Sequence, residues 1–99
     1  MRPIHVARLD KTRPALVLTR DQVRSRRQLV TVAPITSTVR GLSVEVSLGV
    51  ANGLDHDCVV NLDNIMTISV DDLGRQIGRL LPEQEIALSR AIHAALDLD

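Results

Sequence analysis

The most informative stretch of this chain is Arg13-Pro14-Ala15-Leu16-Val17-Leu18-Thr19. Its continuous apolar centre predicts a strand that is buried on both faces. Proline is tolerated at the first residue of a strand, so Arg13 stands at the strand's entrance. Further along, Ala33-Pro34-Ile35-Thr36-Ser37 ends a second apolar run with two hydroxyls. A cation and a hydroxyl at the rims of two neighbouring strands make a candidate phosphate site.

Other short strands flank these two stretches. Residues 42–48 alternate strictly between apolar and polar side chains, which is typical of a half-exposed strand. Asn52-Gly53 is a turn signal in the loop that follows. Besides residues 13–19, the predicted strands are residues 3–9, 28–35, 42–48, 58–62 and 65–70.

Helical signals are fewer. Thr19-Arg20-Asp21-Gln22 has the form of a capping box and predicts one helical turn. Asp71 predicts the cap of a short helix near Leu73. Pro82 suits the first turn of a final helix. The predicted apolar face of that helix consists of Leu81, Leu88, Ala91, Ile92 and Ala95.

These elements predict a mainly β fold of the α+β class, arranged as a compact barrel with a C-terminal helix. The pattern alone leaves three architectures open: an SH3-like barrel, an OB-fold and a small open sheet. The length predicts a single domain over residues 1–99. A core of this size gains stability when the chain associates with another.

The composition lacks aromatic residues and is uneven in charge. Without Phe, Tyr or Trp, the core must be aliphatic, and RNA bases could stack only on Arg or His. Residues 1–50 hold nine Lys or Arg against three Asp or Glu, whereas residues 51–99 hold three against nine. This asymmetry favours a polyanionic partner, unless the fold interleaves the halves. Arg24, Arg26 and Arg27 fit a solvated turn.

Cys58 is the single cysteine, so an intrachain disulfide is impossible. The histidines are scattered, and no metal-ligand spacing is present, so neither a metal nor another cofactor is expected. The chain has no long apolar run of the kind that spans a membrane, and no signal-peptide core. We therefore expect a soluble, cytoplasmic protein with no membrane partner.

Four segments in this order resemble the MazF/PemK toxins, and the resemblance runs from Ile4 to about Leu96. They are the Arg-Pro strand at residues 13–18, the strand end at residues 33–37, the loop element Gly53-Leu54, and the late paired strands at residues 59–65 and 67–68. The resemblance implies an SH3-like barrel of the MazF/PemK/CcdB type, a C-terminal helix and a homodimer.

The resemblance also implies a function. Such toxins are sequence-specific, metal-independent endoribonucleases that cleave single-stranded RNA and are neutralised by a cognate MazE-like antitoxin. The family's essential arginine falls on Arg13, its essential threonine on Thr36, and the acidic residue of some members on Asp63. Where those members carry an arginine two residues earlier, this chain has Asn61. The predicted RNA-binding residues are Lys11, Thr12, Ser37, Arg40 and His56.

The chemistry of metal-free RNA cleavage makes its own demands. The 2′-hydroxyl attacks phosphorus and leaves a 2′,3′-cyclic phosphate and a 5′-hydroxyl. Arg13 suits stabilisation of the extra charge, and Thr36 can donate a hydrogen bond to a phosphate oxygen. A base and an acid are needed as well. Because arginine is effectively always protonated, the base is left open among Asp63, Glu45, His5 and His56.

Two departures from the family and two rival functions bear on this prediction. The connection Asp10-Lys11-Thr12 is shorter than the family's Gly-rich loop, and the residues before Val6 lack the usual Gly, acid and aromatic. The shorter loop should open the site and leaves the RNA sequence preference unpredicted.

A CcdB-like toxin that binds DNA gyrase is the first rival, but that family ends with a tryptophan that this chain lacks. A peptide-binding SH3-like domain would also need aromatic residues.

Overall fold

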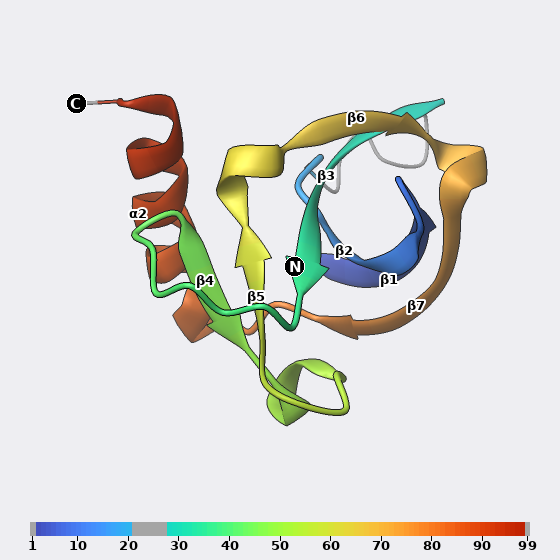
Figure 1. The fold of residues 1–99 in the computed structure, drawn as a ribbon. Coiled ribbons are helices and arrows are strands. Elements are labelled where there is room, and N and C mark those ends of the chain that lie inside the picture. Colours follow the sequence, from blue (N-terminus) through green and yellow to red (C-terminus); the bar gives the residue numbers. More distant parts are fainter. Residues whose placement is uncertain (1, 21–27, 99) are drawn as a thin grey trace.

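The computed structural model describes residues 2–20 and 28–98. This part of the chain folds into seven antiparallel strands and one C-terminal helix (Figure 1). The prediction of a mainly β fold with a final helix is confirmed. The helix α2 spans Glu85–Leu96. The strands are β1 (Pro3–Arg8), β2 (Thr12–Val17), β3 (Leu29–Thr36), β4 (Glu45–Leu48), β5 (Cys58–Asn61), β6 (Met66–Ser69) and β7 (Leu73–Arg79).

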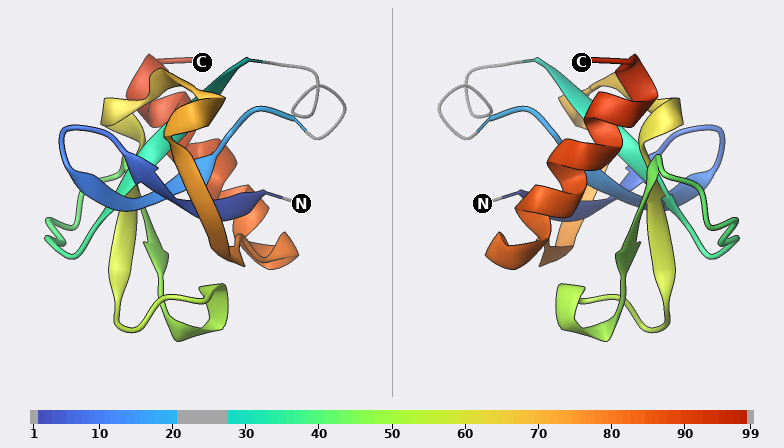
Figure 2. Two further views of the ribbon diagram at one scale, coloured as in Figure 1. Left: turned by 90° about the vertical axis from the view of Figure 1, so that its right-hand side faces the viewer. Right: turned by 90° about the vertical axis from the view of Figure 1, so that its left-hand side faces the viewer.

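Strand β3 organises the sheet. The strand order is β4-β5-β3-β2-β1-β7, and β6 also pairs with β3. The first half of β3 pairs with β6, and its end, at Ile35 and Thr36, pairs with β5. Because one strand serves both partners, the sheet curls into a small barrel, and the hairpin of β4 and β5 extends away from it (Figure 2).

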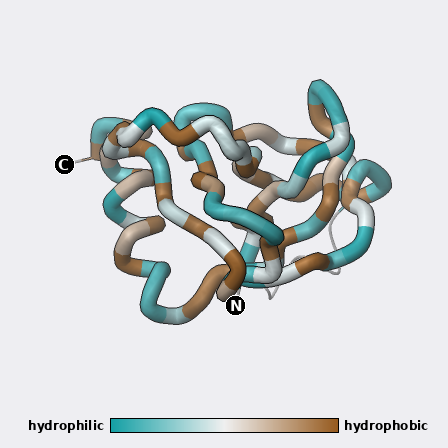
Figure 3. Tube along the Cα trace, turned by 60° about the horizontal axis from the view of Figure 1, so that its bottom comes forward, coloured by the Kyte–Doolittle hydropathy of each residue, from teal (hydrophilic) through white to brown (hydrophobic). Residues whose placement is uncertain are grey.

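The core is aliphatic and lies on both faces of β2. Leu16 belongs to the cluster that packs against Leu88 and Ala91 of α2. Ala15 and Val17 point the other way, into a second cluster with Val30 and Val32. The prediction that β2 is buried on both faces is therefore confirmed. In Figure 3, α2 alternates between hydrophilic and hydrophobic along its turns, as a helix with one buried face should.

The predicted strand at residues 42–48 is wrong in its first half. Strand β4 begins at Glu45, and the Leu42 side chain is 46% exposed. The cause is the Glu45 carboxylate, which accepts N–H groups from Arg40, Gly41 and Leu42. These bonds wrap the preceding loop around Glu45, so the alternating pattern does not continue as a strand.

The short helix predicted near Leu73 ends just before that residue and is not capped by Asp71, and the strand β7 at residues 73–79 was not predicted. A single 3-10 turn, Val70–Asp72, precedes the strand, and the Ser69 hydroxyl caps it by accepting the Asp71 N–H. Glycine is depleted in strands, so Gly74 and Gly78 hid β7 from a pattern-based prediction. A Cβ at Gly78 would lie 1.7 Å from the Asn52 carbonyl oxygen, so only glycine lets β7 pass there.

Residues 49–57, named here the His56 loop, are fastened to the rest of the molecule by Asn52. Its buried amide accepts the Gly49 N–H and donates to the Arg79 carbonyl and to the Gln84 side chain. Gln84 closes the short 3-10 helix that leads into α2, where Pro82 was predicted to start the final helix. The predicted turn at Asn52-Gly53 is confirmed, with φ +91° at Gly53.

Two predictions cannot be compared with the structure. The helical turn after Thr19 and the cluster of Arg24, Arg26 and Arg27 lie largely or wholly outside the described residues. The Thr19 hydroxyl oxygen accepts the N–H of Thr31 on β3. This bond ties the end of the β2 segment to the start of β3.

Candidate active site

The pairing of β2 with β3 brings Arg13 and Thr36 together. Ala15 lies opposite Pro34 in the antiparallel register. Arg13 and Thr36 each lie two residues beyond this pair, at the ends of their strands. Residues directly opposite in an antiparallel pair project to the same face. Both residues line the same two hollows, so they lie at one rim of the barrel, and their role as a phosphate site stays a prediction.

The Arg13 guanidinium is held by one ion pair, and not all of its N–H donors have a partner. One terminal nitrogen donates to the Asp10 carboxylate at 3.1 Å, and the side chain is only 22% exposed. Its Nε is buried and has no hydrogen-bond partner. A buried donor without a partner is costly and is found at sites that receive a ligand's acceptor. Arg13 is thus oriented by Asp10 and retains donors for an anionic ligand.

The Thr36 hydroxyl is also arranged to donate. Its oxygen accepts the N–H of Thr38 at 3.1 Å, in a turn that directly follows β3. A hydroxyl has one donor and two acceptor positions. Because the Thr38 amide uses an acceptor position, the proton of the Thr36 hydroxyl is available for an oxygen of a bound ligand.

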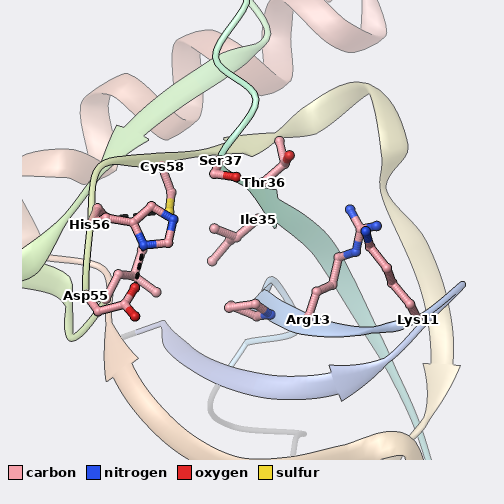
Figure 4. Close-up of a pocket in the computed structure, with 10 residues that line it drawn as sticks. Lys11, Arg13, Ile35, Thr36, Ser37, Asp55, His56 and Cys58 are labelled. Atoms are coloured by element: carbon pink, nitrogen blue, oxygen red, sulfur yellow. Dashed lines mark hydrogen bonds and ion pairs between the residues drawn. The ribbon is translucent and has the colours of Figure 1, made fainter.

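Three hollows meet at Arg13. The histidine hollow, about 200 Å³, also includes Thr36 and His56 (Figure 4). The arginine hollow, about 210 Å³, also includes Thr36 and Arg40. The aspartate hollow, about 370 Å³, includes Asp63 instead of Thr36. A phosphate at Arg13 would therefore have space for nucleotides on more than one side.

Most of the predicted RNA-binding residues line these hollows. Lys11, Ser37 and His56 lie in the histidine hollow, and Arg40 lies in the arginine hollow. Thr12 is exposed at the start of β2 and does not line any of the three. The prediction for Thr12 is therefore the one that the geometry supports least.

Two of the candidate bases are occupied elsewhere. The Glu45 carboxylate accepts backbone N–H groups of the loop before β4. His5 Nδ1 lies 2.9 Å from the Gly74 carbonyl oxygen on β7. Asp63 and His56 line hollows that include Arg13. The geometry thus narrows the search for proton carriers to these two residues.

Sequence reasoning missed the partners of the site residues. Asp10 pairs with Arg13, and Asp55 pairs with His56 Nδ1. Each lies within three positions of its partner in the chain, so proximity was the available signal. An aspartate is so common in turns that spacing alone does not distinguish a partner from a turn residue.

Cys58 is not a nucleophile in this arrangement. Burial raises the pKa of the Cys58 thiol, and the carboxylates of Asp55 and Asp57 raise that pKa further. The Sγ lies 3.5 Å from the His56 carbonyl oxygen. A protonated, buried thiol is unreactive, so Cys58 contributes to the wall of the hollow and to the position of the loop.

The described part of the chain has no cluster of three or more side chains suited to hold a metal ion. Within residues 2–20 and 28–98, no helix is both long and apolar enough to cross a membrane.

Comparisons with known proteins agree with this geometry. Residues 4–96 match the family model described as "PemK-like, MazF-like toxin of type II toxin-antitoxin system". The chain is 61% identical over 99 residues to "Endoribonuclease MazF3" of Mycobacterium tuberculosis, and the match covers 100% of this chain and 96% of the relative.

Solved structures show the same likeness. The chain is similar to the Mycobacterium tuberculosis toxin MazF-mt6, with a TM-score of 0.97, 60% identity and 99% of each chain covered. It also resembles a mycobacterial endoribonuclease solved in complex with its cognate antitoxin, with a TM-score of 0.87, 26% identity, and 98% of this chain and 93% of that chain covered. These matches confirm the predicted toxin-type barrel.

Proposed function

Because this chain belongs to the PemK-like, MazF-like toxin family, it is an endoribonuclease toxin, and we propose that it cleaves single-stranded RNA at a phosphate bound between Arg13 and Thr36. The observation that supports this most is the rim itself. Arg13 has a buried Nε without a partner, and the Thr36 hydroxyl, whose oxygen accepts the Thr38 N–H, lines the same two hollows. The CcdB-like alternative is not favoured, because the relatives are named endoribonucleases.

The proposed reaction needs no metal. The 2′-oxygen attacks phosphorus, and the negative charge grows on the nonbridging oxygens. Donors that are already in place stabilise such charge without reorganising. The Arg13 guanidinium supplies a cation with a terminal donor, and the Thr36 hydroxyl supplies another donor. The products are a 2′,3′-cyclic phosphate and a 5′-hydroxyl.

We assign Asp63 as the base that takes the proton of the 2′-hydroxyl. Asp63 shares the aspartate hollow with Arg13. Its backbone N–H is bound by the Asn61 side chain at 2.9 Å, which fixes the 3-10 turn Leu62–Asn64. We assign Lys11, Ser37 and Arg40 as contacts to the RNA, with Thr12 at the edge of this surface. We expect the protein to cleave RNA at a specific sequence.

A cognate antitoxin and a second copy of the chain are the proposed partners. The mycobacterial structure that resembles this chain holds a cognate antitoxin. An acidic, flexible antitoxin segment suits the cations Lys11, Arg13 and Arg40 and would compete with RNA there. We propose that the toxin is a homodimer and acts in the cytoplasm, where mRNA is found.

The test is to map the ends of RNA cut by the purified protein. A long RNA is incubated in excess chelator, and the new ends are identified by selective ligation and phosphorylation. We expect cuts at a recurring short sequence with 5′-hydroxyl ends. Cleavage that requires Mg²⁺, or 5′-phosphate ends, would contradict the mechanism. Asp63→Asn should lower kcat by about 10²–10⁴, and an unchanged kcat would remove Asp63 from it.

A further inference from the structure

The proposed reaction still lacks the acid that protonates the leaving 5′-oxygen. In phosphoryl transfer, the entering and leaving oxygens lie roughly in line, on opposite sides of phosphorus. Asp63 lines one hollow and His56 lines another, and Arg13 is the residue that both hollows share. A phosphate bound at Arg13 thus borders one hollow that is lined by a carboxylate and another that is lined by an imidazole.

The backbone around His56 is anchored on both sides. Leu54 is buried, and its N–H donates to the Gly49 carbonyl at 3.3 Å. Cys58 begins β5 and pairs with Leu48 of β4. Asn52 fastens the same loop to Gln84. His56 is therefore presented by a loop that is fixed before and after it, and a fixed loop can hold a side chain in place for chemistry.

The imidazole of His56 has one nitrogen engaged and one free. Nδ1 contacts the Asp55 carboxylate. The other nitrogen, Nε2, is on the side of the ring that faces the hollow, across from Arg13 and Thr36 (Figure 4). A carboxylate that accepts from one ring nitrogen orients the imidazole, as in hydrolases that combine histidine with aspartate.

The other proton-bearing side chains in the histidine hollow fit an acid less well. Lysine and arginine hold their protons too strongly to release them near neutral pH, which excludes Lys11 and Arg13. Burial raises the pKa of the Cys58 thiol, and its Sγ lies at the His56 carbonyl oxygen. Imidazole is the side chain that gives and takes a proton in the physiological range.

Resting on the proposed function, we propose that His56 is the general acid of RNA cleavage and that Asp55 is its positioning residue. The 2′-oxygen forms a bond to phosphorus as its proton passes to Asp63. The bond between phosphorus and the 5′-oxygen breaks, and its electron pair goes to that oxygen, which takes the proton from His56 Nε2. Water then returns a proton to His56 and removes one from Asp63, so the enzyme is unchanged.

The experiment compares two leaving groups. The cleaved sequence is first mapped with the wild-type protein. One oligonucleotide then carries that linkage unaltered, and a second carries sulfur in place of the bridging 5′-oxygen. A thiolate leaves without a proton. His56→Asn should lower kcat on the oxygen substrate by about 10²–10⁴ and leave KM nearly unchanged, and the sulfur substrate should restore a rate close to that of the wild type.

Matched variants separate the acid from other roles. Arg13→Ala should be slow on both substrates, because charge stabilisation is needed for either leaving group. Asp55→Asn should lose about tenfold on the oxygen substrate alone, the scale of removing an orienting partner. Asp57→Asn removes the same charge nearby, and His93→Asn alters a histidine on α2. Both should retain wild-type rates.

The outcomes are distinct. Selective rescue of His56→Asn by sulfur supports the assignment. An unchanged kcat for His56→Asn overturns it, and so does an equal loss on both substrates, which would indicate a role in binding or in the shape of the loop. A wild-type protein that cuts neither substrate nor long RNA overturns the proposed function itself, so the two failures can be told apart.

Discussion

The two sides of the candidate site are built in different ways. Arg13 and Thr36 sit on the paired strands β2 and β3, two residues beyond the pair of Ala15 with Pro34. Asp55 and His56 sit on the His56 loop, which the buried amide of Asn52 fastens to Arg79 of β7 and to Gln84. The strand rim is thus positioned by many backbone bonds, whereas the loop depends on a few side-chain bonds. A single substitution at the rim should therefore leave the local structure intact, whereas a substitution that removes one of the side-chain bonds should disturb the loop.

The largest expected effect is loss of Arg13. Arg13→Ala should lower kcat/KM by about 10²–10³, the scale for removing one donor to a transition-state charge. The fold should be retained, because β2 keeps its buried residues Ala15, Leu16 and Val17. Initial rates on a mapped RNA substrate, with circular dichroism as the control for folding, check this.

Arg13→Lys sharpens the result, because lysine keeps the charge but loses the planar fork. It should recover only part of the activity. Full activity in Arg13→Ala would contradict the assignment of the rim as the phosphate site.

Thr36 is expected to contribute less. Thr36→Val keeps the shape and removes the hydroxyl, so it should lose one charge-assisted hydrogen bond of about 1.5–3 kcal/mol. At about 1.4 kcal/mol per tenfold, kcat should fall roughly 10- to 100-fold. Thr36→Ser retains the hydroxyl and the turn bond to Thr38, and it should stay near the wild-type rate. Equal losses in both variants would show that packing, and not the hydroxyl, is what matters.

The double variant of Arg13→Ala with Thr36→Val tests whether the rim acts as a unit. Groups that act together on one transition state are strongly non-additive. The double variant should therefore be only slightly slower than Arg13→Ala. If the two losses multiplied fully, the residues would be acting independently.

The same contrast explains which parts of the site could be predicted. The rim follows from local signals: an apolar run at residues 13–19 and a strand end at residues 33–37 are readable in the sequence, and two such strands pair. The loop does not follow from local signals, because it depends on contacts between Asn52, Arg79 and Gln84, which lie far apart in the chain.

The sequence did not predict strand β7 for the same reason. Its glycines weaken any strand pattern. Gly78 is required because the His56 loop crosses β7 closely there: a Cβ at Gly78 would lie 1.7 Å from the Asn52 carbonyl oxygen. The early boundary predicted for β4 has a related cause, since the Glu45 carboxylate binds the loop before it. In each case a long-range or side-chain contact overrode the local pattern.

A substitution of Asn52 tests how the His56 loop is anchored, because it removes the anchor without changing Asp55 or His56. Asn52→Ala removes the partners of the Gly49 N–H, the Arg79 carbonyl and the Gln84 side chain. These bonds are partly buried, so each contributes about 0.5–1.5 kcal/mol, and the free energy of unfolding should fall by about 2 kcal/mol. Urea denaturation at a fixed protein concentration measures this.

Asn64→Ala is the matched control, because Asn64 is exposed and its side chain should matter little for stability. Its free energy of unfolding should lie within about 0.5 kcal/mol of the wild type. If Asn52→Ala were as stable as Asn64→Ala, the loop would be held by its backbone, and the contrast between the two sides would disappear.

The smallest expected effect is at Arg40, which lines the arginine hollow with Arg13 and Thr36 but lies on an exposed loop. An exposed cation that touches a phosphate adds affinity without taking part in the chemical step. Arg40→Gln should therefore raise KM by a few-fold and leave kcat unchanged, on the scale of about 0.2–1 kcal/mol for an exposed charge pair. The slope of log affinity against log salt should fall by about 0.7, the value for one contact to single-stranded nucleic acid.

Arg90→Gln on α2 removes the same charge away from the hollows, and its salt slope should match the wild type. A change of kcat in Arg40→Gln would move this residue from the binding surface into the reaction, and equal salt slopes for the two variants would remove it from the RNA path.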